Sequence, residues 1–214
     1  MALRVTVDPH HPDDRSLVLA AEVIQAGGVI VYPTETLYGI GANALNPAAV
    51  AKVRQAKGTE SGKPMLLLVP ESASVRLLVT EISPIAAALM EAFWPGPLTI
   101  VFPASSAVPG EVLGGGTSVG IRVPSSALCI RLLRLAGSPL VSTSANEPGG
   151  PPLRSVDAIQ KALARGVDLF LDAGELPESK PSTVVDVTQD PPRLLRAGQI
   201  KTDAIREIAR NLAP

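Results

Sequence analysis

The stretch Gly27-Gly28-Val29-Ile30-Val31-Tyr32-Pro33-Thr34-Glu35-Thr36-Leu37-Tyr38-Gly39-Ile40-Gly41 carries the strongest fold signal in this sequence. An apolar, β-branched run ends at a proline, and two hydroxyls, a carboxylate, a phenol and two glycines follow. This pattern predicts a buried strand followed by a polar turn, and open α/β sheets bind ligands at such turns. The paired glycines would let main-chain amides approach an anion closely. A plain connection from strand to helix explains this segment equally well.

Short apolar runs alternate with helical patterns on both sides of this stretch. Strands are predicted at 3–7, 29–32, 65–69, 98–102, 119–123, 140–142, 169–172 and 183–187. Helices are predicted at 14–26, 47–56, 84–93, 126–136, 155–164 and 202–211. The second of these helices has both of its ends marked, because Asn46-Pro47 supplies a cap and a first-turn proline and Gly58 can close it.

This alternation indicates an α/β sheet. The sheet should be mixed rather than purely parallel, because a loop without a helix joins 98–102 to 119–123 and because the late strands crowd together. No linker-like change of composition and no repeat occurs, so residues 1–214 are predicted to form one domain.

Composition excludes several classes of function. Aromatic residues make up 3% of the chain and the net charge is −1, which argues against base-stacking platforms and broadly basic nucleic-acid surfaces. The single cysteine, Cys129, excludes an internal disulfide and is expected to fill the core. The only histidines, His10 and His11, do not suit a multi-histidine metal site. Because no leader or membrane-length apolar run is present, a cytosolic location is expected.

Two familiar catalytic patterns fail on their context. The chain has no P-loop, and Gly114–Gly120 does not fit Gly-x-Gly-x-x-Gly. Gly116, Ser118 and Gly120 match the Gly-x-Ser-x-Gly pattern of serine hydrolases. That motif needs a helix after the serine and a histidine later in the chain, whereas here a strand follows and both histidines lie upstream.

Hydrogen-bond donors gather at the ends of the predicted strands. They come from a loop with two lysines, an arginine inside an apolar run, a Ser/Thr/Asn cluster, a hydroxyl pair and a second arginine: Lys57, Lys63, Arg122, 142–146, 182–183 and Arg196. Each has a structural explanation, such as a solvated lysine, an arginine paired with a carboxylate or a helix cap. Together, with few carboxylates among them, they suit a phosphate and a small polar ligand.

The ordered motifs of this chain resemble those of the YrdC-like threonylcarbamoyl-AMP synthases over roughly residues 13–200. The resemblance rests on PTETLYGIG at 33–41, Lys57, KP at 63–64, WPGPLT at 94–99, RVP at 122–124, STSAN at 142–146, STVVD at 182–186 and LRAG at 195–198. It implies a YrdC-like α/β fold in which a twisted mixed parallel/antiparallel sheet with flanking helices surrounds a positively charged cavity.

The resemblance also implies an activity. Members of the family combine L-threonine, bicarbonate and ATP, with Mg²⁺ bridging the phosphates, into threonylcarbamoyl-adenylate and release pyrophosphate. This nucleotidyltransferase reaction is the first step of N6-threonylcarbamoyladenosine formation at position 37 of tRNA, and a downstream tRNA threonylcarbamoyl transferase complex accepts the product. Such chemistry depends on positioning and charge neutralisation rather than on a protein nucleophile.

Residue roles follow from the same resemblance, motif by motif. Lys57 and Arg122 are the expected catalytic residues. The expected ATP-binding residues are Lys57, Lys63, Ser144, Asn146 and Arg196. The expected threonine-binding residues are Thr34, Thr36, Tyr38, Arg122, Ser142 and Ser182. No protein side chain is expected to bind the metal, because Mg²⁺ would arrive with ATP.

Three positions depart from the family pattern, and they keep an alternative open. Thr59 stands where the family usually has an arginine, Leu68 where many members have a histidine, and Glu178-Ser179-Lys180 replaces a glycine-containing approach to Ser182. The last of these resembles a paralogous branch regarded as RNA-binding, so the alternative is a weakly active or non-catalytic protein that binds tRNA or double-stranded RNA. A carbamoyl-phosphate-handling relative of the hydrogenase-maturation type fits less well, because those chains are longer and contain zinc-binding cysteines.

Overall fold

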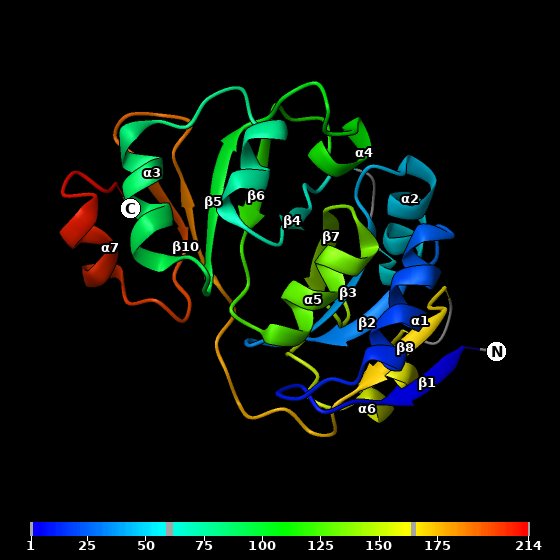
Figure 1. Ribbon diagram of the computed structural model, residues 1–214. Helices are drawn as coiled ribbons and strands as arrows, with labels where there is room; N and C mark the ends of the chain where they lie inside the picture. The colour runs from blue at the N-terminus through cyan, green and yellow to red at the C-terminus, as the bar shows by residue number, and fades with distance from the viewer. Residues whose placement is uncertain (1, 59–61, 164–165, 214) are drawn as a thin grey trace.

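The computed structural model describes residues 2–58, 62–163 and 166–213, and Thr59 therefore lies outside the described residues. Ten strands in this part of the chain form one sheet, in the order β1-β8-β2-β3-β7-β4-β6-β5-β9-β10 (Figure 1). In chain order the strands are Leu3–Thr6, Ile30–Pro33, Tyr38–Asn43, Leu66–Leu68, Leu98–Pro103, Ser118–Arg122, Leu140–Ser144, Leu169–Asp172, Thr183–Asp186 and Arg193–Arg196. Neighbours pair in parallel at β1/β8, β8/β2, β4/β6 and β5/β9 and antiparallel elsewhere. This confirms the predicted mixed α/β sheet.

The helices begin and end close to where the sequence predicts. In chain order, α1 to α7 span Asp14–Gln25, Pro47–Lys57, Pro84–Phe93, Gly110–Leu113, Ala127–Ala136, Val156–Ala162 and Thr202–Ile208, and a 3₁₀ helix spans Ser72–Leu77. The Asn46 side chain accepts from the amides of Ala48 and Ala49, and Gly58 closes α2 at φ 59°, in the left-handed region that favours glycine. A loop without a helix was predicted between β5 and β6. This is wrong, because the one-turn helix α4 lies there.

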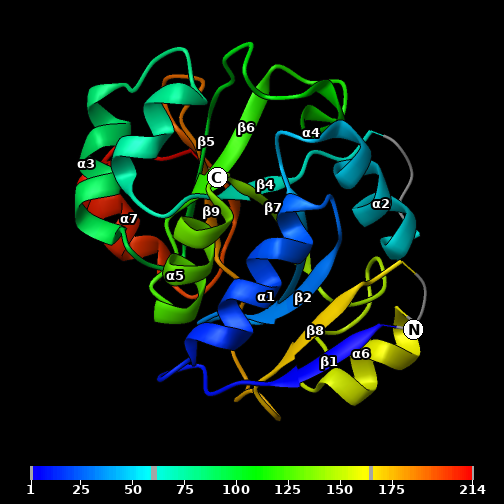
Figure 2. The ribbon, with the colours of Figure 1, turned by 45° about the vertical axis from the view of Figure 1, so that its right-hand side comes forward.

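Two groups of helices cover the two faces of the sheet (Figures 1 and 2). Helices α1 and α5 lie side by side on one face, and they share a core cluster that includes Leu17, Leu132 and Leu140. Buried residues of α2, α3, α4, α6 and α7 contribute to a larger cluster on the other face, which includes Ile100 and Ile121. The buried thiol of Cys129 lies in the first cluster, as predicted.

The predicted buried strand and polar turn are both present, but the turn leads into a second strand and not into a helix, so the opening stretch forms a β-hairpin. Strand β2 ends at Pro33, residues 34–37 form the turn, and β3 runs back antiparallel with Pro33 opposite Tyr38. Gly39 and Gly41 therefore lie inside a strand and not in a loop, and neither has a positive φ. They do not form the anion-binding turn that the sequence suggested.

The two glycines make room for an aromatic ring. A Cβ atom built on Gly41 would lie 2.2 Å from the carbonyl oxygen of Val141 and 3.3 Å from the hydroxyl oxygen of Tyr32. The buried Tyr32 side chain therefore crosses β3 over these glycines, and its hydroxyl donates to Ser142 Oγ on β7 at 2.9 Å. Glycine at these positions thus links β2 to β7 through a side chain that spans the strand between them.

Strand β10 was not predicted from the sequence. It spans Arg193–Arg196, pairs antiparallel with β9 through an irregular register near Leu194 and lies at one edge of the sheet. It is mostly exposed and holds only two apolar residues, so the sequence shows no apolar run there.

Candidate functional site

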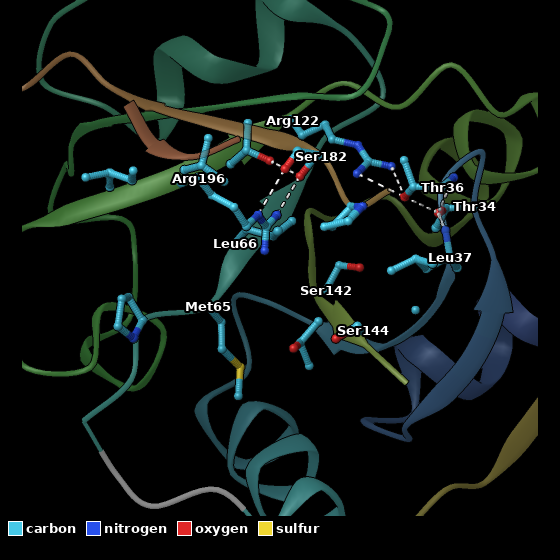
Figure 3. Close-up of a pocket in the computed structure, with 18 of the residues that line it drawn as sticks. Thr34, Thr36, Leu37, Met65, Leu66, Arg122, Ser142, Ser144, Ser182 and Arg196 are labelled. Carbon is cyan, nitrogen blue, oxygen red and sulfur yellow. Dashed lines mark hydrogen bonds between the residues drawn. The ribbon is translucent and has the colours of Figure 1, made fainter. Parts of the chain in front are cut away.

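A cavity of about 530 Å³ opens beside α1 and α5, on the part of their sheet face that these two helices do not cover (Figure 3). Strand β7 shows how this face is divided, because side chains of a strand alternate between its two faces. Leu140 packs beneath α1 and α5, whereas Ser142 and Ser144, two and four residues further along, line the cavity. The helices and the cavity therefore share one face of the sheet.

The same alternation separates the cavity from the core on the strands beyond β7. On β5, Thr99 and Val101 line the cavity while Ile100 lies in the core of the opposite face. On β6, Gly120 and Arg122 line it while Ile121 lies in the core. Donors that the sequence placed at strand ends thus lie along the face of the sheet as well.

Arg122 is the most deeply buried charged residue of the cavity wall. Its NH2 atom donates to Glu35 Oε1 at 2.8 Å, and NH1 and NH2 each lie 3.4 Å from Thr36 Oγ1. A buried arginine needs an anionic partner, and Glu35 supplies it. Figure 3 shows the guanidinium reaching across from β6 toward the hairpin turn.

A second arginine reaches the cavity from β10. Arg196 donates from NH2 to Ser182 Oγ at 2.9 Å and from Nε to the Ser182 carbonyl oxygen at 3.0 Å. The Ser182 hydroxyl in turn lies 2.9 Å from Thr99 Oγ1. Desolvation lowers the pKa of Arg196, and the positive charge of Arg122 lowers it further. An anion bound between the two guanidinium groups would relieve that repulsion.

The hydroxyl of Thr34 builds the hairpin turn. It donates to the Leu37 carbonyl oxygen at 2.7 Å and accepts from the amides of Thr36 and Leu37, each at 3.1 Å. The Tyr38 hydroxyl similarly donates to the carbonyl oxygen of Gly174 at 2.8 Å and accepts from the amide of Ala173. Both residues line the cavity, and both also fix the backbone that shapes it.

Lys57 lies behind the cavity wall rather than in it. Its Nζ donates to the carbonyl oxygen of Ser144 at 2.7 Å, to the carbonyl oxygen of Asn146 and to Asn146 Oδ1 at 3.5 Å. Burial lowers the pKa of Lys57 to about 8. Lys57, the last residue of α2, therefore fixes the main chain at the end of β7. The two residues that it bonds there, Ser144 and Asn146, are both predicted to bind the nucleotide.

The structure brings together nine of the eleven predicted site residues. Those that line the cavity are Thr34, Thr36, Tyr38, Arg122, Ser142, Ser144, Asn146, Ser182 and Arg196. Lys57 and Lys63 do not line it. Lys63 is exposed, and its carbonyl oxygen accepts from Arg54 NH2 at 2.7 Å, next to Pro64 of the cavity rim.

Several lining residues were not assigned to the site from the sequence. Thr99, Ser118 and Asp186 belong to motifs that were noted, and the every-second-residue spacing of small and polar side chains at 118, 120 and 122 could have identified that face. Met65, Leu66 and Leu195 supply apolar wall, which carries no chemical signature in a sequence. Asp186 is the one acidic residue among the described lining residues, and its Oδ1 accepts from the amide and hydroxyl of Thr188.

Two further features of the described residues bear on function. Within residues 2–58, 62–163 and 166–213, no helix has both the length and the apolarity that crossing a membrane requires. Over the same ranges, no cluster of three or more His, Cys, Asp or Glu residues is arranged to hold a metal ion.

Comparison with known proteins identifies the family. A model of the Sua5, YciO and YrdC proteins, described as "Telomere recombination", matches residues 22–198. The chain belongs to this family. It is 36% identical over 205 residues to a putative threonylcarbamoyl-AMP synthase of Mycobacterium tuberculosis, covering 95% of this chain and 94% of that protein. It is 35% identical over 190 residues to the threonylcarbamoyl-AMP synthase of Pyrococcus abyssi, covering 89% of this chain.

The fold of this family member agrees with a solved relative. The structure of P. abyssi Sua5 in complex with L-threonine superposes with a TM-score of 0.94 at 32% identity, over 99% of this chain and 62% of that one. The chain spans 56% of the length of the P. abyssi synthase that it matches.

Proposed function

We propose that this member of the Sua5/YciO/YrdC family synthesises L-threonylcarbamoyladenylate from L-threonine, bicarbonate and ATP and releases pyrophosphate. The observation that carries this proposal is the meeting of Arg122, Arg196 and the hydroxyls of three strands in one cavity. The names of the relatives favour catalysis over the RNA-binding alternative.

The proposed chemistry has two steps. The threonine amine and bicarbonate form a carbamate with loss of water, and a carbamate oxygen then attacks the α-phosphorus of ATP while pyrophosphate leaves. Arg122 would pair with the threonine carboxylate, Ser142 and Ser182 would orient the amino acid, and Arg196 would hold the nucleotide. Mg²⁺ would enter with ATP and neutralise charge on the phosphates.

Lys57 is best placed to act on the nucleotide through the turn at 144–146. Its ammonium group bonds the main chain of Ser144 and Asn146, whose side chains line the cavity. In the proposed enzyme this turn carries the nucleotide contacts, so Lys57 would contribute either by holding the turn or by exchanging these oxygens for phosphate oxygens. We further propose that the protein works in the cytoplasm and passes its product to a tRNA threonylcarbamoyl transferase complex.

The test is pyrophosphate release by the purified protein supplied with Mg²⁺, ATP, bicarbonate and L-threonine. Release should require threonine and bicarbonate and should fall at least a hundredfold in Arg122→Gln. Thermal stabilisation by ATP plus threonine should exceed that by either alone. A folded protein that releases no pyrophosphate and binds duplex RNA in a salt-dependent manner would contradict the proposal and favour the RNA-binding alternative.

A further inference from the structure

The pairing of Glu35 with Arg122 places a negative charge beside the cation proposed to receive the amino acid. Glu35 Oε1 lies 2.8 Å from Arg122 NH2, and the two side chains are 16% and 5% exposed. Glu35 itself does not line the cavity, whereas its neighbours Thr34 and Thr36 do. The carboxylate therefore acts on a ligand from behind the wall, through its charge and through Arg122.

The ion pair uses only part of its hydrogen-bonding capacity. Among the described residues, Glu35 Oε2 and Arg122 Nε are both buried without a partner, so the pair is bonded at one point and not as a bidentate fork. Within the part of the chain that the structure describes, Arg122 NH1 makes one hydrogen bond, the long 3.4 Å contact to Thr36 Oγ1. The guanidinium thus keeps donor capacity for a ligand carboxylate while Glu35 cancels much of its charge.

Arg122 and Glu35 together place a positive and a negative charge side by side at this end of the cavity. Arg122 attracts a carboxylate, and Glu35 repels one that carries no compensating positive charge. Asp186, the acid that lines the cavity, is the last residue of β9, the strand that begins directly after Ser182. An α-amino acid in its zwitterionic form carries an ammonium group one carbon from its carboxylate, so it matches the pair. A simple carboxylic acid does not.

We propose that Glu35 is a specificity-determining residue that makes the Arg122 subsite select zwitterionic amino acids over simple carboxylates. This inference rests on the proposed function, because it takes the Arg122 subsite to be the site of threonine. If Glu35 served only to neutralise a buried arginine, removing its charge would change the affinity for both kinds of ligand by the same factor. The ratio of the affinity for the amino acid to the affinity for the simple carboxylate would then stay constant.

The experiment compares two ligands that differ in one group. L-Threonine and (R)-3-hydroxybutyrate share the carboxylate, the hydroxyl and the methyl group, and only threonine has the amine. Their dissociation constants are measured by calorimetry on the unaltered protein and on Glu35→Gln, which keeps the shape and an acceptor oxygen but removes the charge. Glu35→Asp, which keeps the charge, and Glu81→Gln, an exposed acid elsewhere on the surface, are the matched controls.

We expect the unaltered protein to prefer threonine by at least tenfold and Glu35→Gln to reduce that preference at least tenfold, mainly by gaining affinity for 3-hydroxybutyrate. Glu35→Asp and Glu81→Gln should keep the preference. An unchanged preference in a folded Glu35→Gln protein overturns the inference. Should that variant not fold, equal affinities of the unaltered protein for the two ligands overturn it as well. Failure of the unaltered protein to bind threonine contradicts the proposed function itself, and the inference with it.

Discussion

The hydroxyl of Tyr32 lies 2.9 Å from Ser142 Oγ, although strand β3 separates the strands that carry them. Burial raises the pKa of Tyr32, so the phenol stays protonated and donates to Ser142. The serine oxygen is thereby occupied as an acceptor, and its own hydrogen is left to donate to a ligand in the cavity. Tyr32 therefore orients a residue that we expect to bind the amino acid.

Replacing Tyr32 by phenylalanine tests this orientation. Tyr32→Phe keeps the ring over the glycines of β3 and removes one buried hydrogen bond, which should lower the free energy of unfolding by about 1 kcal/mol. The affinity for threonine should fall about five- to tenfold because Ser142 is no longer held, and the affinity for ATP should stay within twofold. Calorimetry with each ligand measures both, and a threonine affinity equal to that of the unaltered protein would show that Ser142 needs no such support.

Gly41→Ala should damage the fold, since the added Cβ would lie 2.2 Å from the Val141 carbonyl oxygen and strands β3 and β7 would have to separate. We expect a loss of about 3 kcal/mol in the free energy of unfolding, measured by urea denaturation. Gly110→Ala is the matched control, because nothing lies within 4 Å of a Cβ there and its φ is not positive. Equal stabilities of the two variants would contradict the close approach of β3 and β7.

The pH dependence of stability should report the buried ammonium group of Lys57. Its pKa is about 8 in the folded protein and near 10.5 for an ordinary lysine, so between these values the unfolded chain binds the extra proton. Stability contributed by this residue therefore rises with pH across that window. The free energy of unfolding of the unaltered protein minus that of Lys57→Met should increase by up to about 3 kcal/mol from pH 8 to pH 10.5. A difference that stays flat or falls would show that the pKa is not lowered.

Arg196→Lys separates the geometry of this side chain from its charge. A lysine cannot make both the bond to the Ser182 hydroxyl and the bond to its carbonyl oxygen in the same fixed plane. We expect the dissociation constant for ATP to rise about tenfold or more, which corresponds to roughly 1.5–3 kcal/mol for a charged hydrogen bond. Threonine affinity in the absence of ATP should change less than threefold. The proposed nucleotide role of Arg196 would be wrong if the affinity for threonine fell more than the affinity for ATP.

Local signals in the sequence were enough to predict every α-helix except α4 and most strands. Asn46 and Gly58 mark the two ends of α2 because capping depends on neighbouring residues alone. The burial of Arg122 and its need for a carboxylate also followed from one residue in an apolar run. Glu35, its partner, lies 87 positions away in the chain, and no local pattern connects the two.

The predictions that failed depend on contacts between distant segments. Gly39 and Gly41 suggest a loop when read locally, and only the ring of Tyr32 and the carbonyl oxygen of Val141 explain why a strand needs them. The position of Lys57 behind the wall likewise depends on where the turn after β7 lies. That the chain forms one domain over residues 1–214, and that the cavity carries a net positive charge, stay predictions.

Alternate residues of β5 and β6 have different roles. Ile100 and Ile121 pack in the core, whereas Thr99, Gly120 and Arg122 line the cavity. Mutation and selection can therefore act on the core-facing residues and on the cavity-facing residues separately. Substitutions at the cavity-facing positions can change which small molecules bind. Because the core is left unchanged, the protein stays folded and its amount in the cell does not fall. A paralogue with a new ligand could arise from this scaffold by a few substitutions in that one register.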